Sequence, residues 1–452
     1  MSVLVRYDLR GIQSYIFRTP RLREIRAVGA LPEQLVFRAM LQAAEASADA
    51  SAVSAFGEDA LAACGITVLD RAGGNAVAVF QSEEACRRIS RGMARIVWAE
   101  THALELVYAW VPCTADFAAD HRALAVRLGR IKSAAPSVRD VGAFPVCAAD
   151  PFTGAAVAGL TPEGEPADIV TLLRLRHAPQ DGLRIRSSAD AGGWTAVIHI
   201  DGNGMGERIA RMLDAHAHPY EEAAACFARI TVRDAFAQIC DEAEAEFPQA
   251  APCRLIQAGD DITYLLPAQW ALPFTKRFLE HAAGCFMLQD GGEAARISAC
   301  AGIAYCTAHY PFSEAYETAE RLCMSAKQRG AAHRRPDGLC GCWLDFAVCT
   351  GARSADVQAQ RAAHPAWYRR PYCVATPVQR NKKYDLERLL TQLEALTGDA
   401  PQFSPAQAAA MRRAYTGGSA EESLFDKQGT AVWYDALELA SVLIPPADAG
   451  EE

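Results

Sequence analysis

The alternation of apolar and polar positions follows the same order twice along the chain. The first copy is predicted to contain a strand, helices, a hairpin, a helix, a strand and a helix, at residues 3–7, 11–48, 66–80, 82–100, 104–111 and 116–133. The second copy repeats these six segments at residues 194–201, 207–246, 254–266, 273–284, 297–305 and 313–329. This duplication predicts two related α+β domains, each with an antiparallel sheet and helices on one face.

Two further segments lie outside the repeated units. The segment between the units is rich in Pro, Gly, Ala and Asp, which is typical of a loop-rich insert or linker. The last part of the chain has a strand-like patch at residues 343–346 and helical patterns at 386–397, 406–415 and 431–443. We therefore expect a first domain at 1–135, an insert at 136–192, a second domain at 193–335 and a mostly helical region at 336–452.

The hairpin of the second unit carries two neighbouring carboxylates at its turn. Two apolar, strand-like runs flank Ala258-Gly259-Asp260-Asp261, and glycine suits the tight turn between them. Like charges repel, so Asp260 and Asp261 are favoured side by side where a cation binds. A solvated acidic turn is the alternative, and this short motif alone does not decide between the two.

A third acidic residue, Asp201, ends the first strand of the same unit. A carboxylate at the end of a buried strand is costly unless it is paired or bound to a metal. The following Gly202, Gly204 and Gly206 would let a phosphate approach the backbone amides at the next helix, although an ordinary strand-to-helix turn also uses glycine. If this strand lies beside the hairpin, three carboxylates converge and suit two divalent cations.

The first unit lacks this set of carboxylates. Its hairpin has Gly73-Gly74-Asn75 at the position of Gly259-Asp260-Asp261. A neutral asparagine is a weaker ligand for Mg²⁺ than a carboxylate. We therefore interpret the first unit as structural, or as able to bind a nucleotide without catalysis.

Composition narrows the functional classes. The 452 residues carry a net charge of −9, which disfavours wrapping of nucleic acid over the whole surface, although arginines cluster between residues 6 and 26 and basic residues between 369 and 383. The 15 cysteines include no Cys-x-x-Cys pair, so we expect reduced thiols and no zinc site. No signal peptide or membrane-spanning run is visible, and we expect a cytoplasmic protein without a membrane partner.

Four segments resemble, in the same order, motifs of the large polymerase-like subunit of type III CRISPR effector complexes. These segments are Gly11-Ile12-Gln13-Ser14-Tyr15-Ile16-Phe17, residues 200–206, residues 258–261 and residues 319–327. The resemblance covers roughly residues 1–330. It implies two ferredoxin-like palm domains, related to diguanylate and adenylate cyclases. It also implies synthesis of a cyclic oligoadenylate from ATP with Mg²⁺ or Mn²⁺, as a second messenger in antiviral defence.

The resemblance also assigns residues. Asp201, Asp260 and Asp261 would bind the metal ions and carry catalysis, and Lys327 would neutralise phosphate charge. The remaining nucleotide contacts would come from Gly202, Asn203, Gly204, Met205, Gly206 and Gly259. Asn203 stands where many members have a second acidic residue, and the chain begins directly in the first palm. We therefore expect a short member without the nuclease domain, which acts either alone or as part of an effector complex.

Two functions follow from this resemblance. The first is a metal-dependent nucleotidyltransferase that makes a cyclic nucleotide messenger from ATP. The second is an inactive subunit that binds a nucleotide or RNA, which Asn203 and the arginine-rich opening favour. Nucleoside triphosphates, RNA, CRISPR effector subunits and a second copy of the chain are the partners that these hypotheses allow.

Overall fold

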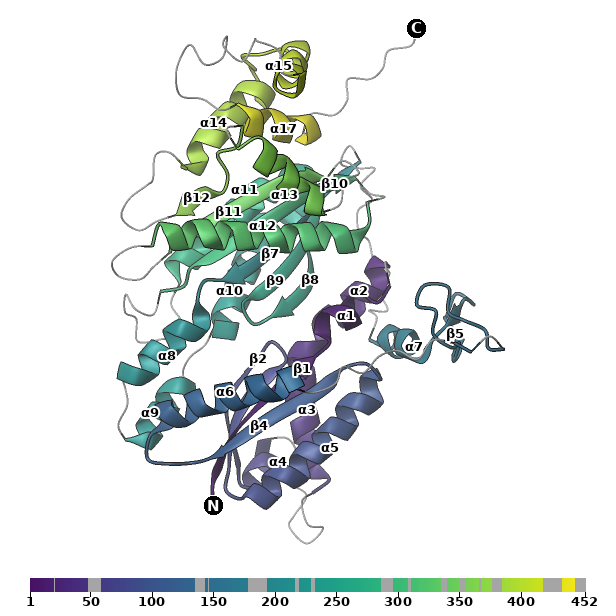
Figure 1. Ribbon diagram of the computed structural model, residues 1–452, viewed down its shortest axis with the longest axis vertical. Helices are drawn as coiled ribbons and strands as arrows, with labels where there is room; N and C mark the ends of the chain where they lie inside the picture. The colour runs from purple at the N-terminus through teal and green to yellow at the C-terminus, as the bar shows by residue number, and fades with distance from the viewer. Residues whose placement is uncertain are drawn as a thin grey trace.

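The two larger β-sheets of the computed structural model follow one another along the long axis of the molecule (Figure 1). The structure describes residues 1–19, 21–47, 58–134, 143–144, 146–177, 193–215, 219–228, 232–285, 296–307, 310–334, 340–349, 354–365, 367–375, 384–417 and 433–443. The basic residues between 380 and 383 lie outside this set, and each predicted domain boundary falls within or beside an undescribed stretch. Among the described residues, no helix is long and apolar enough to cross a membrane.

The first sheet has four antiparallel strands in the order β2-β3-β1-β4. The strands are β1 (Val3–Arg10), β2 (Ile66–Ala72), β3 (Asn75–Phe80) and β4 (Glu105–Pro112). Helices α3 (Leu31–Glu45) and α5 (Glu83–Thr101) pack on one face, and α6 (Phe117–Ala134) packs on the other. The shorter helices of this unit are α1 (Ile12–Ile16), α2 (Leu22–Gly29) and α4 (Glu58–Ala63).

The second sheet repeats this arrangement and extends it. Its strand order is β12-β11-β10-β7-β9-β8, so β8-β9-β7-β10 corresponds strand for strand to β2-β3-β1-β4. The strands are β7 (Trp194–Gly202), β8 (Cys253–Ala258), β9 (Asp261–Pro267), β10 (Ala299–Thr307), β11 (Cys342–Cys349) and β12 (Tyr372–Ala375). The α+β class and the duplication of the sheet are thereby confirmed. Two strands after residue 335 complete the second sheet, and β11 pairs with β10 in parallel.

Both faces of the second sheet are covered by helices. Ala196, Ile198 and Ile200 join the core formed with α10 (Val232–Glu246) and α11 (Ala268–Gly284). Val197 belongs to the opposite core, where α12 (Phe312–Ala332) lies across the sheet. The sequence predicted helices on one face of the sheet, and α12 therefore adds a helical cover on the other face. The remaining helices of this unit are α8 (Met205–Ala215) and α9 (Tyr220–Ala228).

The C-terminal helices are tied to the second sheet by a buried polar network. These helices are α13 (Ser354–Ala363), α14 (Leu386–Thr397), α15 (Pro405–Gly417) and α17 (Tyr434–Leu443). Arg370 forms buried ion pairs with Asp435 and Glu438 of α17. The Tyr372 hydroxyl of β12 also donates to Asp435 over 2.7 Å. Buried charges of this kind need their partners, so the helices and the sheet form one unit.

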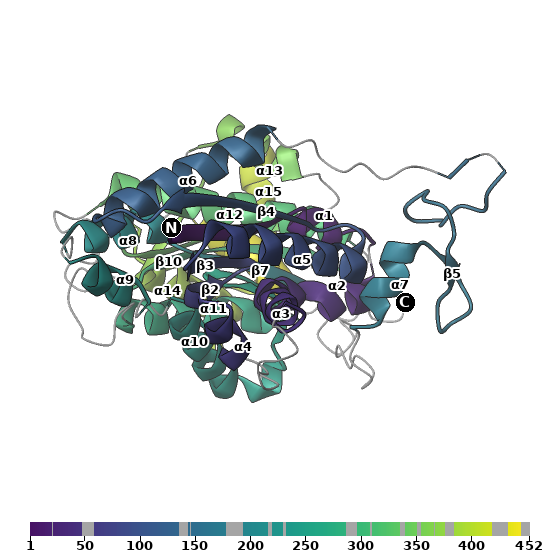
Figure 2. The same cartoon turned by 90° about the horizontal axis from the view of Figure 1, so that it is seen from below.

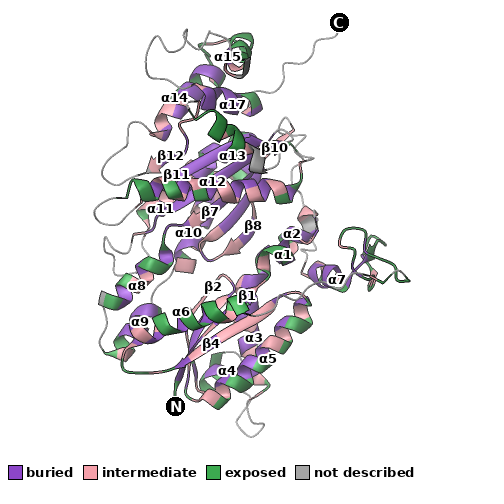
Figure 3. Cartoon of the chain, viewed as in Figure 1, coloured by how far each residue is buried: buried purple, intermediate pink, exposed green. Residues whose placement is uncertain are grey.

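The described part of the insert projects from the body of the molecule (Figures 1 and 2). It contains the two-stranded sheet of β5 (Gly159–Leu160) and β6 (Pro166–Ala167), and then α7 (Ile169–Leu175). Asp168 caps α7 by accepting a hydrogen bond from the Thr171 amide over 2.7 Å. Most of the insert before α7 is exposed (Figure 3), whereas α7 itself packs against α2 and α5.

The two units touch through their backbones. A Cβ atom at Gly29 of α2 would lie 1.6 Å from the carbonyl oxygen of Leu255 in β8. A Cβ atom at Gly73, in the β2–β3 turn, would lie 2.9 Å from the carbonyl oxygen of Ala258. The turn of the first hairpin therefore lies directly against the acidic turn of the second.

Gly302 in β10 allows α12 to lie against the sheet. A Cβ atom there would be 2.0 Å from the Ala319 carbonyl oxygen and 2.5 Å from the Cys323 amide nitrogen. We predict that Gly302→Ala displaces α12 and lowers the free energy of unfolding by about 2–3 kcal/mol. The shift of the urea midpoint measures this loss. Gly129→Ala is the control, because its site on α6 is open, and it should stabilise by about 0.5–1 kcal/mol. Equal midpoints for both variants would contradict the close packing.

Candidate active site

The pairing of β7 with β9 brings the predicted carboxylates to one end of the second sheet. Ile200 of β7 pairs with Ile262 of β9. Because the strands are antiparallel, the residue after Ile200, Asp201, lies beside the residue before Ile262, Asp261. Gly259 has a φ of +69°, which glycine adopts without strain in the tight turn. A Cβ atom on Gly202 would lie 2.6 Å from Oδ2 of Asp260, so this carboxylate lies over the Gly202 backbone. Asp201 and the adjacent pair Asp260 and Asp261, which follow it by 59 and 60 residues, therefore lie at the same end of one sheet.

Crowding of these charges shifts their protonation. Burial and the charge of Asp201 raise the pKa of Asp260 to about 6. Burial, followed by the charges of Asp201, Asp260 and Glu320, raises the pKa of Asp261 to about 7. Near neutral pH, the folded chain therefore holds negative charge here at a cost in free energy.

Lys327 of α12 is the cation that the structure places at this site. Its ammonium group donates hydrogen bonds to Oδ2 of Asp201 and, over 2.8 Å, to the carbonyl oxygen of Gly202. Burial alone would lower the pKa of Lys327, but the charge and hydrogen bond of Asp201 raise it above its ordinary value. Lys327 thus competes with any metal ion for Asp201. Within the described residues, no three His, Cys, Asp or Glu side chains are grouped closely enough to share one ion.

The glycine-rich turn after β7 is shaped by its own bonds. Gly204 has a φ of +62°, a conformation that favours glycine. The Asn203 amide donates to the carbonyl oxygen of Gly341 over 3.0 Å and to Oγ of Ser298 over 3.3 Å. Met205 packs in the core, and the space next to Gly206 is open. The side chains of Asn203 and Met205 therefore support the turn, while Gly204 and Gly206 leave its backbone accessible and Gly202 is covered by Asp260.

Sequence reasoning missed His199, Tyr316 and Glu320. The Nδ1 atom of His199 lies 3.5 Å from Oδ1 of Asp261, and the His199 ring meets the edge of the Tyr316 ring with 5.5 Å between centroids. Burial lowers the pKa of His199 to about 4, so it is neutral at pH 7 and does not offset the carboxylates. Strand alternation could have revealed His199, because it lies two residues before Asp201 on the same face.

The first unit keeps part of this arrangement. Asp8 of β1 pairs with Asn75 of β3, as Asp201 lies beside Asp261. Nζ of Lys132 in α6 lies 2.7 Å from Oδ2 of Asp8. Lys132 follows Phe117 by 15 residues, and Lys327 follows Phe312 by the same interval, so the sequence already carries this correspondence between the units. The first unit thus retains one aspartate and its lysine, with asparagine in place of the second carboxylate.

The raised pKa of Asp261 predicts a pH-dependent gain in stability when its charge is removed. The folded-state pKa of about 7 exceeds the ordinary value of 3.8, so the charged form destabilises the fold progressively as pH rises from about 4 to 7. Asp261→Asn should therefore raise the thermal midpoint at pH 8 by at least about 2 °C and leave it nearly unchanged at pH 4. Asp399→Asn, at an exposed position after α14, should shift neither midpoint. The same gain at both pH values would exclude charge crowding.

Comparison with known proteins supports the fold. No protein-family model matches the sequence, and no curated protein matches it in sequence. The crystal structure of the Csm1–Csm4 cassette in complex with cA4 matches with a TM-score of 0.50 and 14% identity, covering 98% of this chain and 70% of that chain. The cassette in complex with cA3 matches with the same TM-score and identity, covering 98% of this chain and 69% of that chain. At this identity the likeness concerns the fold alone: the chain has an α+β fold similar to that of Csm1.

Proposed function

We propose that this protein is a metal-dependent nucleotidyltransferase that joins ATP into a cyclic oligonucleotide, as part of a CRISPR-type antiviral defence. The observation that carries the proposal is the convergence of Asp201, Asp260 and Asp261 at the end of one sheet, next to Lys327. The Csm1-like fold supports it, because the matched structures contain cA4 and cA3.

The residues present suit a divalent cation. Three carboxylates supply the hard oxygen ligands that Mg²⁺ and Mn²⁺ prefer. Oδ1 of Asp261 is buried and has no hydrogen-bond partner among the described residues, and the raised pKa values of Asp260 and Asp261 show that positive charge would stabilise their ionised forms. Bound metal would lower the pKa of an attacking ribose hydroxyl and stabilise the leaving pyrophosphate. Asp201, Asp260 and Asp261 would hold it, after Lys327 releases Asp201 and the three carboxylates draw close enough to share the ion.

The other residues would position the substrate. Lys327 is the mobile cation: on a long side chain, it can exchange its bond to Asp201 for a phosphate oxygen. The exposed backbone at Gly204 and Gly206 would allow the triphosphate to approach closely, whereas Gly202 lies under Asp260 and Gly259 is buried against the first hairpin. This chemistry requires no protein nucleophile, since positioning and charge neutralisation supply most of the rate. A partner subunit also belongs to the proposal, because Csm1 forms a cassette with Csm4 in the matched structures.

The alternative function is binding of a nucleotide or RNA without turnover. Two observations favour it. Lys327 already donates a hydrogen bond to Asp201. Asn203 stands where many members of the family have a carboxylate, and its side-chain amide is hydrogen-bonded to Gly341 and Ser298. Calorimetry separates the two functions, because a binding subunit would bind ATP without Mg²⁺ and release no pyrophosphate. RNA binding that is lost on combining Arg21→Glu with Arg23→Glu would support the same alternative.

Removing both carboxylates of the hairpin should abolish synthesis. We predict that Asp260→Ala combined with Asp261→Ala lowers product formation by at least about 10³-fold, because the metal loses its ligands. Mass spectrometry of the products from purified protein, mixed nucleotides and Mg²⁺ or Mn²⁺ measures this loss. A circular dichroism spectrum like that of the wild type shows that the fold is kept. Unchanged product in the double variant would refute the enzyme.

Lys327 should have opposite effects on metal binding and on turnover. Lys327→Met removes the competitor for Asp201, so we expect tighter Mn²⁺ binding without nucleotide, by about tenfold. The same change removes the cation proposed for the phosphates, so turnover of ATP should fall by about 10²-fold or more. Electron paramagnetic resonance of free Mn²⁺ and pyrophosphate release measure the two effects. Weaker Mn²⁺ binding in this variant would contradict the competition.

A further inference from the structure

Helix α1 of the first unit contacts α12 of the second unit close to the acidic site. Nε2 of Gln13 donates to Oε1 of Glu320 over 3.2 Å and lies 3.5 Å from the Tyr316 hydroxyl. The ring of Phe17, which follows α1, lies 4.4 Å from that of Tyr316 between centroids. The first unit therefore reaches the helix that carries Lys327 through the polar contacts of Gln13 and the ring contacts of Phe17.

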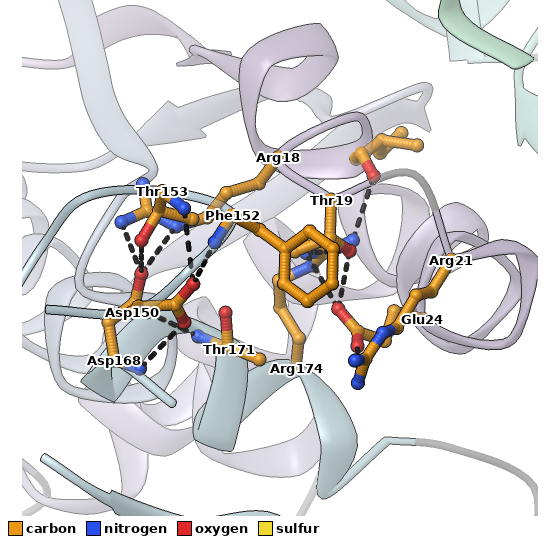
Figure 4. Close-up of polar contacts among 11 residues, drawn as sticks. Arg18, Thr19, Arg21, Glu24, Asp150, Phe152, Thr153, Asp168, Thr171 and Arg174 are labelled. Carbon is orange, nitrogen blue, oxygen red and sulfur yellow. Dashed lines mark hydrogen bonds and ion pairs between the residues drawn. The ribbon is translucent and has the colours of Figure 1, made fainter. Parts of the chain in front are cut away.

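The end of α1 and the residues that follow it, 16–19, are held by the insert (Figure 4). Nε and Nη2 of Arg18 donate to Oδ2 of Asp168 over 3.1 and 2.7 Å. Arg174 of α7 donates from Nη2 to the Ile16 carbonyl oxygen over 2.8 Å, and from Nη1 to Oγ1 of Thr19 over 3.2 Å. The first contact is an ion pair, and the second fixes the backbone at the end of α1.

The charges at this junction are reciprocal. The first unit contributes Arg18 and Glu24, and the insert contributes Asp168 and Arg174. Arg174 is completely buried, and its Nη1 lies 3.4 Å from Oε2 of Glu24. A buried guanidinium that loses its anion is strongly destabilising, so α7 can dock on α1 and α2 in one register only. The insert therefore fixes where α1 lies.

The residues that α1 contacts are neighbours of the proposed chemistry. Tyr316, Glu320 and Lys327 are separated by four and seven residues, so they share one face of α12. His199 contacts both Tyr316 and Asp261. A shift of Tyr316 or Glu320 thus changes the surroundings of Asp261 directly.

We propose that α1 is the positioning element of the acidic site, with Gln13 as its positioning residue and Arg174 acting through it. The Gln13 amide holds the Glu320 carboxylate toward the first unit, so that this fourth negative charge, which already acts on Asp261, does not move closer to it. The insert thereby contributes to catalysis without touching the site. This inference rests on the proposed nucleotidyltransferase function.

Gln13→Met tests the direct contact, because methionine keeps the volume and cannot donate. We expect kcat to fall by about tenfold while KM for ATP changes by less than about twofold, since positioning of the carboxylates acts on the transition state. Gln13→Glu places a carboxylate against Glu320 and should lower kcat at least as far. Glu165→Gln is the matched control: its ion pair with Arg21 is exposed at the edge of the same junction, and kcat should not change.

Arg174→Met tests the insert, and Arg174→Lys tests whether a charge at this position restores the effect. We expect the kcat of Arg174→Met to fall as in Gln13→Met, and Arg174→Lys to recover part of it. Hydrogen exchange of the peptides from α12 is the second readout, and it should be faster in Gln13→Met and unchanged in Glu165→Gln. This readout decides the inference even if Arg174→Met does not fold.

The outcomes separate the two proposals. A wild-type protein that makes no product from ATP would refute the proposed function, and exchange in α12 would then decide alone whether α1 positions that helix. An active wild type together with a Gln13→Met variant of unchanged kcat would overturn the inference. Unchanged exchange in α12 of Gln13→Met would overturn it as well.

Discussion

Repulsion among three carboxylates at the end of the β7–β9 ladder is the constraint on which the second unit depends. Strand pairing sets Asp201 beside Asp261, and the tight turn adds Asp260, so the sheet cannot form without bringing them together. His199 stays neutral, and Lys327 balances Asp201. The fold therefore keeps an uncompensated negative charge that a structural role would not require.

The first unit shows the same framework with that repulsion removed. Asp8 keeps its lysine, but Asn75 replaces the neighbouring carboxylate, so one ion pair satisfies the site. The two duplicated units thus have different roles. One unit is electrostatically relaxed and supports its partner through α1, α2 and the β2–β3 turn, while the other carries the charges that a cation would relieve.

Much of this arrangement follows from local sequence. Apolar runs predicted the strands of both units, and glycine next to paired aspartates predicted the acidic turn, because both depend on neighbours along the chain. The joining of β11 and β12 to the second sheet, the docking of Arg174 and the approach of Gln13 to Glu320 depend on contacts between distant segments. No local pattern specifies them. His199 and Lys132 were not predicted, although local sequence contains a signal for both: strand alternation places His199 on the face of Asp201, and the spacing from Phe117 places Lys132 as Lys327 is placed from Phe312.

The contacts of Gly29 and Gly73 with β8 and the acidic turn have a mechanical consequence. Where two backbones meet directly, no layer of side chains remains whose rotamers could absorb a hinge rotation. The contact between the units is therefore stiff, and a hinge motion that moved the two units apart to admit a substrate would break it. Entry and exit of a nucleotide must then rely on small movements of side chains such as Lys327 and of the segments next to the acidic site, while the two sheets stay in place.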